Sequence, residues 1–410
     1  MITKEAELQF SNILEELGKA LDPTETQIKD AKSRYKAIGN YLSEEDSPLA
    51  PYKPEIKPQG SFLIGTMIKP VSEECELDFD LTFHLTGKPK DWTQYDLKKA
   101  VGDRLFASTT YKGMLEKPDG RRCWRIDYAG TTKFHLDILP SVIDNNLLYF
   151  EKSGTITERN VYQHALRITD NMSDNYFTET NHKLWPKSNP KGFGEWFKDQ
   201  MKVRFVEMKK SFSKTAGIEI ENIQDFEIKT PLQRAVQILK RHRDIMFGND
   251  EDRPISIIIT TLAGLSYNQE DNIYDALINI LEIMPTHIKT IFDSTKGEYI
   301  SWIANPVNPE ENFADKWIDT PRKKTNFIIW LKKAKEDILQ AIELRGLNNV
   351  QEKLEKSFGN FAVKDAFQKI AENQRFQREK GNLHIAPKSG IIGSIGTPIT
   401  NHNFYGKKEQ

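Results

Sequence analysis

A glycine-serine turn followed by an acidic strand is the part of this 410-residue chain whose residues could do chemistry. The turn is Gln59-Gly60-Ser61, and the strand carries Asp78 and Asp80 at alternate positions. Backbone N–H groups of such a turn can hold a phosphate, and carboxylates on one strand can hold divalent metal ions. The pair of features therefore predicts chemistry on a phosphorylated substrate bound with metal.

The acidic residues share one face of their strand. Alternation places Glu76, Asp78 and Asp80 opposite the apolar positions between them. Asp137 is placed in the same way in a later apolar strand, residues 133–140. Like charges on one face repel, so a cation is expected among them. Asp78, Asp80 and Asp137 together predict a site for two metal ions in a mixed sheet.

Two choices in this ligand set stay open. Glu76 with Asp78 is the alternative to Asp78 with Asp80, which we prefer because Glu76 lies near the start of the strand. Asp127 competes with Asp137 as the third ligand and ranks below it, because Asp137 lies in the more apolar strand.

The elements that must position these residues are helices and short strands. Helical spacing of apolar residues predicts a broken helix over 5–44, interrupted at Pro23. An extended connector over 48–58 leads to the turn, after which a short helix is expected over 61–69. The remaining predicted elements are a helix over 92–105, strands over 123–128 and 147–150, and helices over 195–212, 230–244, 256–265, 274–284, 326–344 and 350–378.

Composition narrows the class of protein. With 38% hydrophobic residues the chain can bury a large core, which we expect to be split into two lobes. The 58 basic and 59 acidic residues nearly cancel, so a protein that coats nucleic acid is not indicated. Cys75 and Cys123 show no zinc spacing. Neither a signal peptide nor a membrane span is expected, and we expect a cytoplasmic protein.

The motifs resemble a known family. Gln59-Gly60-Ser61, Asp78-Phe79-Asp80 and Leu136-Asp137 look like the signature of polymerase-β-type nucleotidyltransferases. Within them the chain most resembles the CD-NTases, the cyclic oligonucleotide synthases of CBASS anti-phage systems, which are similar to animal cyclic GMP-AMP synthase and to oligoadenylate synthases.

The resemblance implies an α+β, bilobal, polymerase-β-like fold, with a mixed sheet, a long N-terminal helix and a helical second lobe. We expect a catalytic lobe with N-terminal spine helices over 1–215 and a helical lobe over 216–386. A flexible glycine-containing tail is expected over 387–410.

The same resemblance implies an activity. It is Mg²⁺-dependent synthesis of a cyclic di- or trinucleotide second messenger from ATP and a second NTP, with two Mg²⁺ ions or with Mn²⁺. A template-free transferase that makes linear oligonucleotides or modifies RNA is one alternative, and a catalytically silent nucleotide sensor is another. A downstream effector would bind the product, and a regulatory protein could engage the tail. Activation by nucleic acid is not indicated.

Single residues are carried over by the same resemblance. Lys240 matches a lysine that contacts the donor triphosphate, and Ser256 matches the serine that supports it or caps a helix. Gln59 is expected to contact the nucleotide through its side chain, together with Gly60 and Ser61. Arg125 is expected to hold a phosphate of the second nucleotide.

Overall fold

The computed structural model describes two compact units of the chain. The described residues are 3–72, 76–128, 133–144, 165–217, 219–220, 228–294, 296–385, 392–393 and 396–399. One unit holds the sheet and comprises Pro23–Ile228 with Ile303–Phe313. The other is mainly helical and comprises Met1–Asp22, Lys229–Trp302 and Ala314–Gln410.

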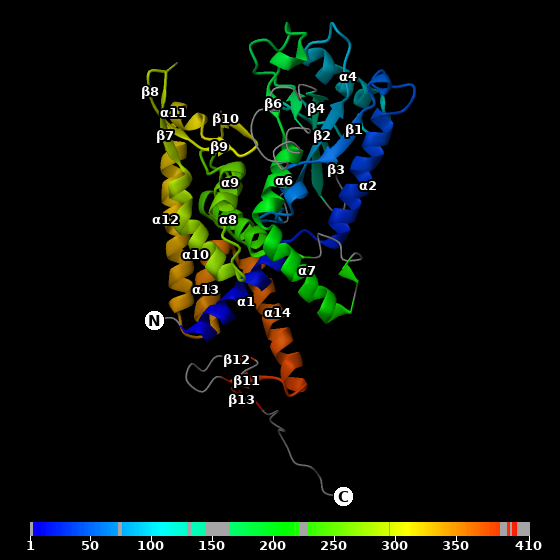
Figure 1. The fold of residues 1–410 in the computed structure, drawn as a ribbon. Coiled ribbons are helices and arrows are strands. Elements are labelled where there is room, and N and C mark those ends of the chain that lie inside the picture. The colour runs from blue at the N-terminus through cyan, green and yellow to red at the C-terminus, as the bar shows by residue number, and fades with distance from the viewer. Residues whose placement is uncertain are drawn as a thin grey trace, which may run out of the picture. The chain divides into compact units, whose positions relative to one another are not determined.

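The sheet unit is built on six strands (Figure 1). They are β1 (Glu55–Pro58), β2 (Leu77–Leu85), β3 (Trp124–Tyr128), β4 (Phe134–Ile143), β5 (Leu166–Ile168) and β6 (Lys187–Ser188). β2 pairs with β4 in parallel, and every other pair in this sheet is antiparallel. β3 and β5 share the second edge of β4, where they pair with different parts of it. The predicted mixed sheet of an α+β protein is confirmed.

One face of this sheet is the apolar core. Alternate residues of β2 and β4, including Phe79, Leu81 and Phe134, are fully buried. They belong to one hydrophobic cluster with residues of α2 (Glu25–Leu42) and α4 (Gln94–Ala107). Since strand side chains alternate between faces, the polar residues of β2 and β4 project from the opposite face.

The remaining helices of the sheet unit are short or lie after the sheet. They are α3 (Gly60–Ile64), α6 (Pro190–Gln200) and α7 (Lys202–Ala216), and the unit also holds strands β9 (Ala304–Asn305) and β10 (Asn308–Asn312). The helix predicted over 61–69 is therefore shorter than expected, because Gly65 adopts a left-handed backbone (φ 69°) and ends it. The helix predicted over 195–212 divides at Met201 into α6 and α7.

The helical unit gathers eight helices from distant parts of the described chain. They are α1 (Lys4–Leu21), α8 (Pro231–Phe247), α9 (Ser256–Ser266), α10 (Ile273–Ile283), α11 (Lys316–Asp319), α12 (Pro321–Glu343), α13 (Leu347–Phe358) and α14 (Asn360–Glu379). Short strands complete it: β7 (Lys289–Asp293), β8 (Glu298–Trp302), β11 (His384–Ile385), β12 (Ile392–Gly393) and β13 (Thr397–Pro398).

The first helix belongs to this helical unit and not, as the predicted segments have it, to the unit with the sheet. α1 packs against α8, α10 and α14. Just after α1, the half-buried Asp22 accepts hydrogen bonds from Lys229, from Arg234 Nη1 at 2.8 Å and from Gln237 Nε2 at 2.8 Å. Burial raises the pKa of Asp22, but the charges of Lys229 and Arg234 outweigh it and lower the pKa overall.

Other local expectations have mixed outcomes. The break at Pro23 is confirmed, and Thr24 caps α2 with a hydrogen bond from the backbone N–H of Gln27. Strands β7 to β10, over 289–312, were not expected. The strand predicted over 147–150 lies outside the described residues. No helix in the described part of the chain is long and apolar enough to cross a membrane.

Replacing Phe79 tests how far the core supports the acidic strand. The ring lies between Asp78 and Asp80 in sequence and packs edge-on against Phe62 and Phe134, at centroid distances of 4.9 and 5.5 Å. Phe79→Ala is expected to lower the free energy of unfolding by about 3–5 kcal/mol, because it leaves a cavity under β2. Urea unfolding followed by tryptophan fluorescence measures this loss. Phe79→Leu keeps most of the volume and should cost clearly less, and equal losses would contradict the account.

Candidate active site

Strand pairing arranges six polar side chains in two rows across β2, β4 and β3. The first row is Asp78, His135 and Asp127, and the second row is Asp80, Asp137 and Arg125. Directly paired residues project from the same face of a sheet. The face opposite the apolar core therefore carries four carboxylates, one imidazole and one guanidinium within two adjacent rows.

The Gln59-Gly60 turn lies against Asp80. The backbone N–H of Gln59 donates to the Asp80 carbonyl at 2.9 Å. Gly60 has φ +56°, and a Cβ at this position would lie 2.4 Å from Asp80 Oδ2. Only glycine fits both the left-handed backbone and this close approach. The turn and the acidic strand, sixteen residues apart in sequence between Ser61 and Asp78, are thus neighbours in the fold.

The side-chain amide of Gln59 has a partner within the protein. Its Nε2 donates to the carbonyl of Leu81 at 3.5 Å. This contact fixes the turn to β2, and it differs from the nucleotide contact expected from the sequence. Gly60 and Ser61, the first two residues of α3, follow directly.

Asp137 is held by Arg125. Arg125 donates from Nε to Asp137 Oδ1 at 3.0 Å and from Nη2 to Oδ2 at 3.3 Å, and its Nε lies 3.4 Å from Glu116. The hydrogen bond to Asp137 is the main reason why the pKa of Arg125 is raised. In this structure the arginine predicted to hold a phosphate compensates the charge of a predicted metal ligand. Glu116 was missed because nothing in the sequence sets it apart from other exposed glutamates.

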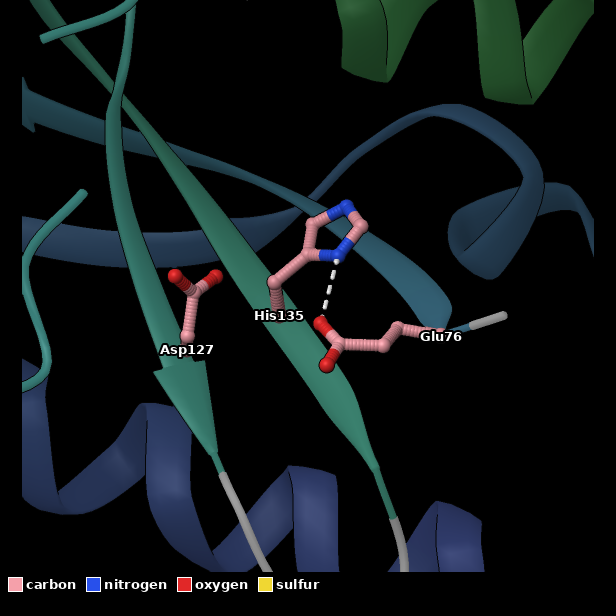
Figure 2. A group of neighbouring side chains, drawn as sticks. All are labelled: Glu76, Asp127 and His135. Atoms are coloured by element: carbon pink, nitrogen blue, oxygen red, sulfur yellow. Dashed lines mark ion pairs between the residues drawn. The ribbon is translucent and has the colours of Figure 1, made fainter. Parts of the chain in front are cut away.

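His135 lies among three carboxylates. Its Nε2 is 3.0 Å from Asp78 Oδ1, and its Nδ1 is 3.5 Å from Glu76 Oε2. Figure 2 shows the ring between Glu76 and Asp127, with the ion pair to Glu76 marked. Burial favours the neutral ring, but the nearby Asp78 carboxylate outweighs it and raises the pKa of His135. Burial raises the pKa of Asp127, and the charges of Glu76 and Glu116 add to this shift.

These donors can meet around a metal ion. Asp78, His135 and Asp137 each offer one ligand atom, and the three atoms lie within 4.8 Å of one another. Glu76, Asp127 and His135 form a second set that meets the same limit. Asp80 is in neither set among the described residues, and its carboxylate lies beside Gly60. Oxygen-rich donors of this kind suit a hard divalent cation, so the residues fit the predicted metal ions.

Lys240 and Ser256 belong to the helical unit, whereas the residues of the polar face belong to the sheet unit. Lys240 is buried on α8. Ser256 Oγ accepts a hydrogen bond from Arg243 Nη1 at 2.9 Å. The expectation that Ser256 caps a helix is wrong, because Ile255 is the capping residue of α9. Their expected contacts with a triphosphate stay predictions.

Comparison with known proteins extends these observations. Residues 8–160 match the model of the Second Messenger Oligonucleotide or Dinucleotide Synthetase domain. A c-di-GMP synthase of Roseivirga ehrenbergii is 30% identical over 413 residues, which cover 99% of this chain and 100% of that protein. The cyclic dinucleotide synthase CdnG of Bradyrhizobium diazoefficiens is 25% identical, over 89% of this chain and 86% of the relative.

The fold agrees with these relatives. The solved structure of the Bradyrhizobium diazoefficiens CD-NTase CdnG in complex with GTP has a TM-score of 0.66 at 20% identity, and the match covers 88% of this chain and 99% of that chain. This chain therefore shares the fold of that structure. The full-length likeness to the Roseivirga protein goes further, and the chain belongs to the CD-NTase family of second messenger oligonucleotide or dinucleotide synthetases.

Gly60→Ala tests whether the turn must approach Asp80 closely. The added methyl group would collide with Asp80 Oδ2, so Asp80 or the turn must move. We expect nucleotide transfer to fall roughly 10²-fold, since misplacing a catalytic group by about 1 Å has that cost. Product formation from labelled nucleoside triphosphates, with the melting temperature as a check on folding, measures this effect.

Gly217→Ala is the matched control. Gly217 has a similar backbone (φ +67°) in the same unit, but nothing lies within 4 Å of its added Cβ. It carries the same backbone strain without the collision, so its activity should stay close to that of the parent. An equal loss in both variants would show that strain, and not the approach to Asp80, is responsible.

Proposed function

We propose that the polar face of β2, β4 and β3 is the catalytic centre of a metal-dependent synthase that joins two GTP molecules into a cyclic dinucleotide. The observation that carries this proposal is the register that pairs Asp80 with Asp137 beside Asp78, with the Gly60 turn packed on Asp80. The choice of guanine follows the relative that matches this chain over its full length, a c-di-GMP synthase.

Asp78, Asp80 and Asp137 are the residues proposed to hold the metal ions. Asp80 is preferred to Glu76 because Glu76 is engaged with the His135 ring, whereas Asp80 faces the turn. Asp137 is preferred to Asp127 because it pairs directly with Asp80. Bound divalent cations would make the acceptor hydroxyl more acidic and neutralise the charge of the triphosphate.

The chain's own residues position the reactants around these ligands. The backbone N–H groups and the hydroxyl of Gly60-Ser61 are proposed to bind the donor triphosphate next to Asp80. Arg125 keeps Asp137 in place through two hydrogen bonds. Its guanidinium is also proposed to bind a phosphate of the second nucleotide. Lys240 and Ser256 are proposed to complete the triphosphate contacts from the helical unit.

The reaction is a phosphoryl transfer that occurs twice. A ribose hydroxyl of one GTP attacks the α-phosphorus of the other and releases its proton to solvent. A phosphodiester bond forms, the bond from the α-phosphorus to the oxygen that bridges to the β-phosphorus breaks, and pyrophosphate leaves. The hydroxyl of the linear product then attacks its own α-phosphorus in the same way and closes the ring. Positioning and charge neutralisation supply most of the acceleration in such reactions.

Asp78→Asn tests this function. The substitution removes a charge that the face needs in order to hold metal, so synthesis should fall by about 10²–10³-fold, the loss typical when one stabilising contact at a reacting centre is removed. The full chain is incubated with labelled GTP and Mg²⁺, and products are treated with alkaline phosphatase and identified by mass spectrometry. A cyclic product resists the phosphatase.

Asp103→Asn is the matched control for this experiment. Asp103 is an exposed aspartate on α4 that pairs with Lys99, away from the polar face. Its activity should equal that of the parent. Products that lose terminal phosphates would indicate a linear oligonucleotide, and equal yields from Asp78→Asn and the parent would contradict the assignment of the site.

A further inference from the structure

His135 is the only imidazole among the ligand-forming groups found in the described residues. It projects from β4 between β2 and β3, paired with Asp78 on one side and Asp127 on the other. Its side chain is only 13% exposed. The ring therefore lies in direct contact with Asp78, a residue proposed to hold metal.

The Nε2 atom of His135 is buried and makes no hydrogen bond. Asp78 Oδ1 lies 3.0 Å away, but the arrangement does not form a hydrogen bond. The distance suits two ligands of one ion, because two bonds of about 2.1 Å at a right angle place their donor atoms about 3 Å apart. The Asp137 carboxylate completes a set of three donors within 4.8 Å.

The other ring nitrogen is held by Glu76. Nδ1 lies 3.5 Å from Glu76 Oε2, and the contact is an ion pair when the ring is protonated (Figure 2). Histidines that ligate a metal characteristically give their second ring N–H to a carboxylate, which fixes the tautomer and turns the free nitrogen toward the ion. Glu76 occupies the position of that orienting carboxylate. If Glu76 orients His135, then Asp78 and Asp80 are the two carboxylates of β2 that remain to bind metal.

We propose that His135 ligates a divalent cation through Nε2, together with Asp78 and Asp137, and that this nitrogen makes the site favour Mn²⁺ over Mg²⁺. The inference rests on the proposed function, since it refines the metal site of that reaction. Imidazole nitrogen is a poor ligand for Mg²⁺, which prefers oxygen in strict octahedral geometry, whereas the more tolerant transition metals accept it. His135 is then the residue that sets metal preference.

Pulsed electron paramagnetic resonance of the full chain loaded with Mn²⁺ alone tests the proposal. The bound ion should show modulation from a directly coordinated ¹⁴N nucleus. His135→Asn should abolish this signal and weaken Mn²⁺ binding by about 10–100-fold, as measured from the signal of the free ion. Competition with Mg²⁺ should show a much smaller change in Mg²⁺ binding, so that the preference for Mn²⁺ falls.

His84→Asn is the matched control. His84 lies on β2 with a side chain 12% exposed, it pairs with Glu55, and it belongs to neither set of ligand-forming groups in the described residues. It should keep both the nitrogen signal and the Mn²⁺ affinity. Wild-type protein that binds Mn²⁺ without ¹⁴N modulation would overturn the proposal, and this readout does not depend on how the variant folds. A nitrogen signal that persists in His135→Asn would overturn it equally.

The two proposals fail in different ways. Cyclic dinucleotide synthesis with Mg²⁺ is measured on the same wild-type protein. Product without nitrogen coordination refutes the role of His135 and leaves the function standing. Nitrogen coordination without product in either metal refutes the function.

Discussion

The parallel register of β2 and β4 sets Asp80 beside Asp137 and Asp78 beside His135. Two like charges about 4 Å apart near a protein surface repel by about 4 kcal/mol, so a face with four aspartates is costly unless cations lie among them. Arg125 meets this need in one row and His135 in the other. The protein therefore compensates only part of the negative charge of this face, and the remaining charge favours the binding of divalent cations.

The apolar side of the same strands makes this polar face possible. Phe79 and Leu81 are fully buried beneath the acidic positions, and α2 and α4 contribute to the same core. With one face fixed in this way, a slip of one residue would bury the aspartates, so the register is strongly specified. Gly60 then brings the turn against Asp80, where a side chain would not fit. Packing, backbone conformation and electrostatics therefore all constrain the positions of Gly60 and Asp80.

Features that depend on a repeating sequence pattern could be predicted, whereas contacts that depend on the pairing of distant segments could not. Alternation predicted that Asp78, Asp80 and Asp137 lie opposite the apolar residues of their strands, and Pro23 predicted the break that precedes α2. The contacts of His135 with Asp78 depend on strand register, which alternation alone does not fix. Strand β10 (Asn308–Asn312) reads Asn-Pro-Glu-Glu-Asn and shows no apolar alternation, so it could not be expected.

Diffraction at the manganese absorption edge tests the central claim most directly. Crystals of the full chain would be soaked with Mn²⁺ and a nonhydrolysable GTP analogue, and the ions located by anomalous scattering. The account predicts Mn²⁺ on the polar face, within bonding distance of Asp78, Asp80 and Asp137, with the triphosphate beside Gly60 and Ser61. Ordered Mn²⁺ and analogue bound elsewhere, with these three carboxylates free of metal, would contradict it.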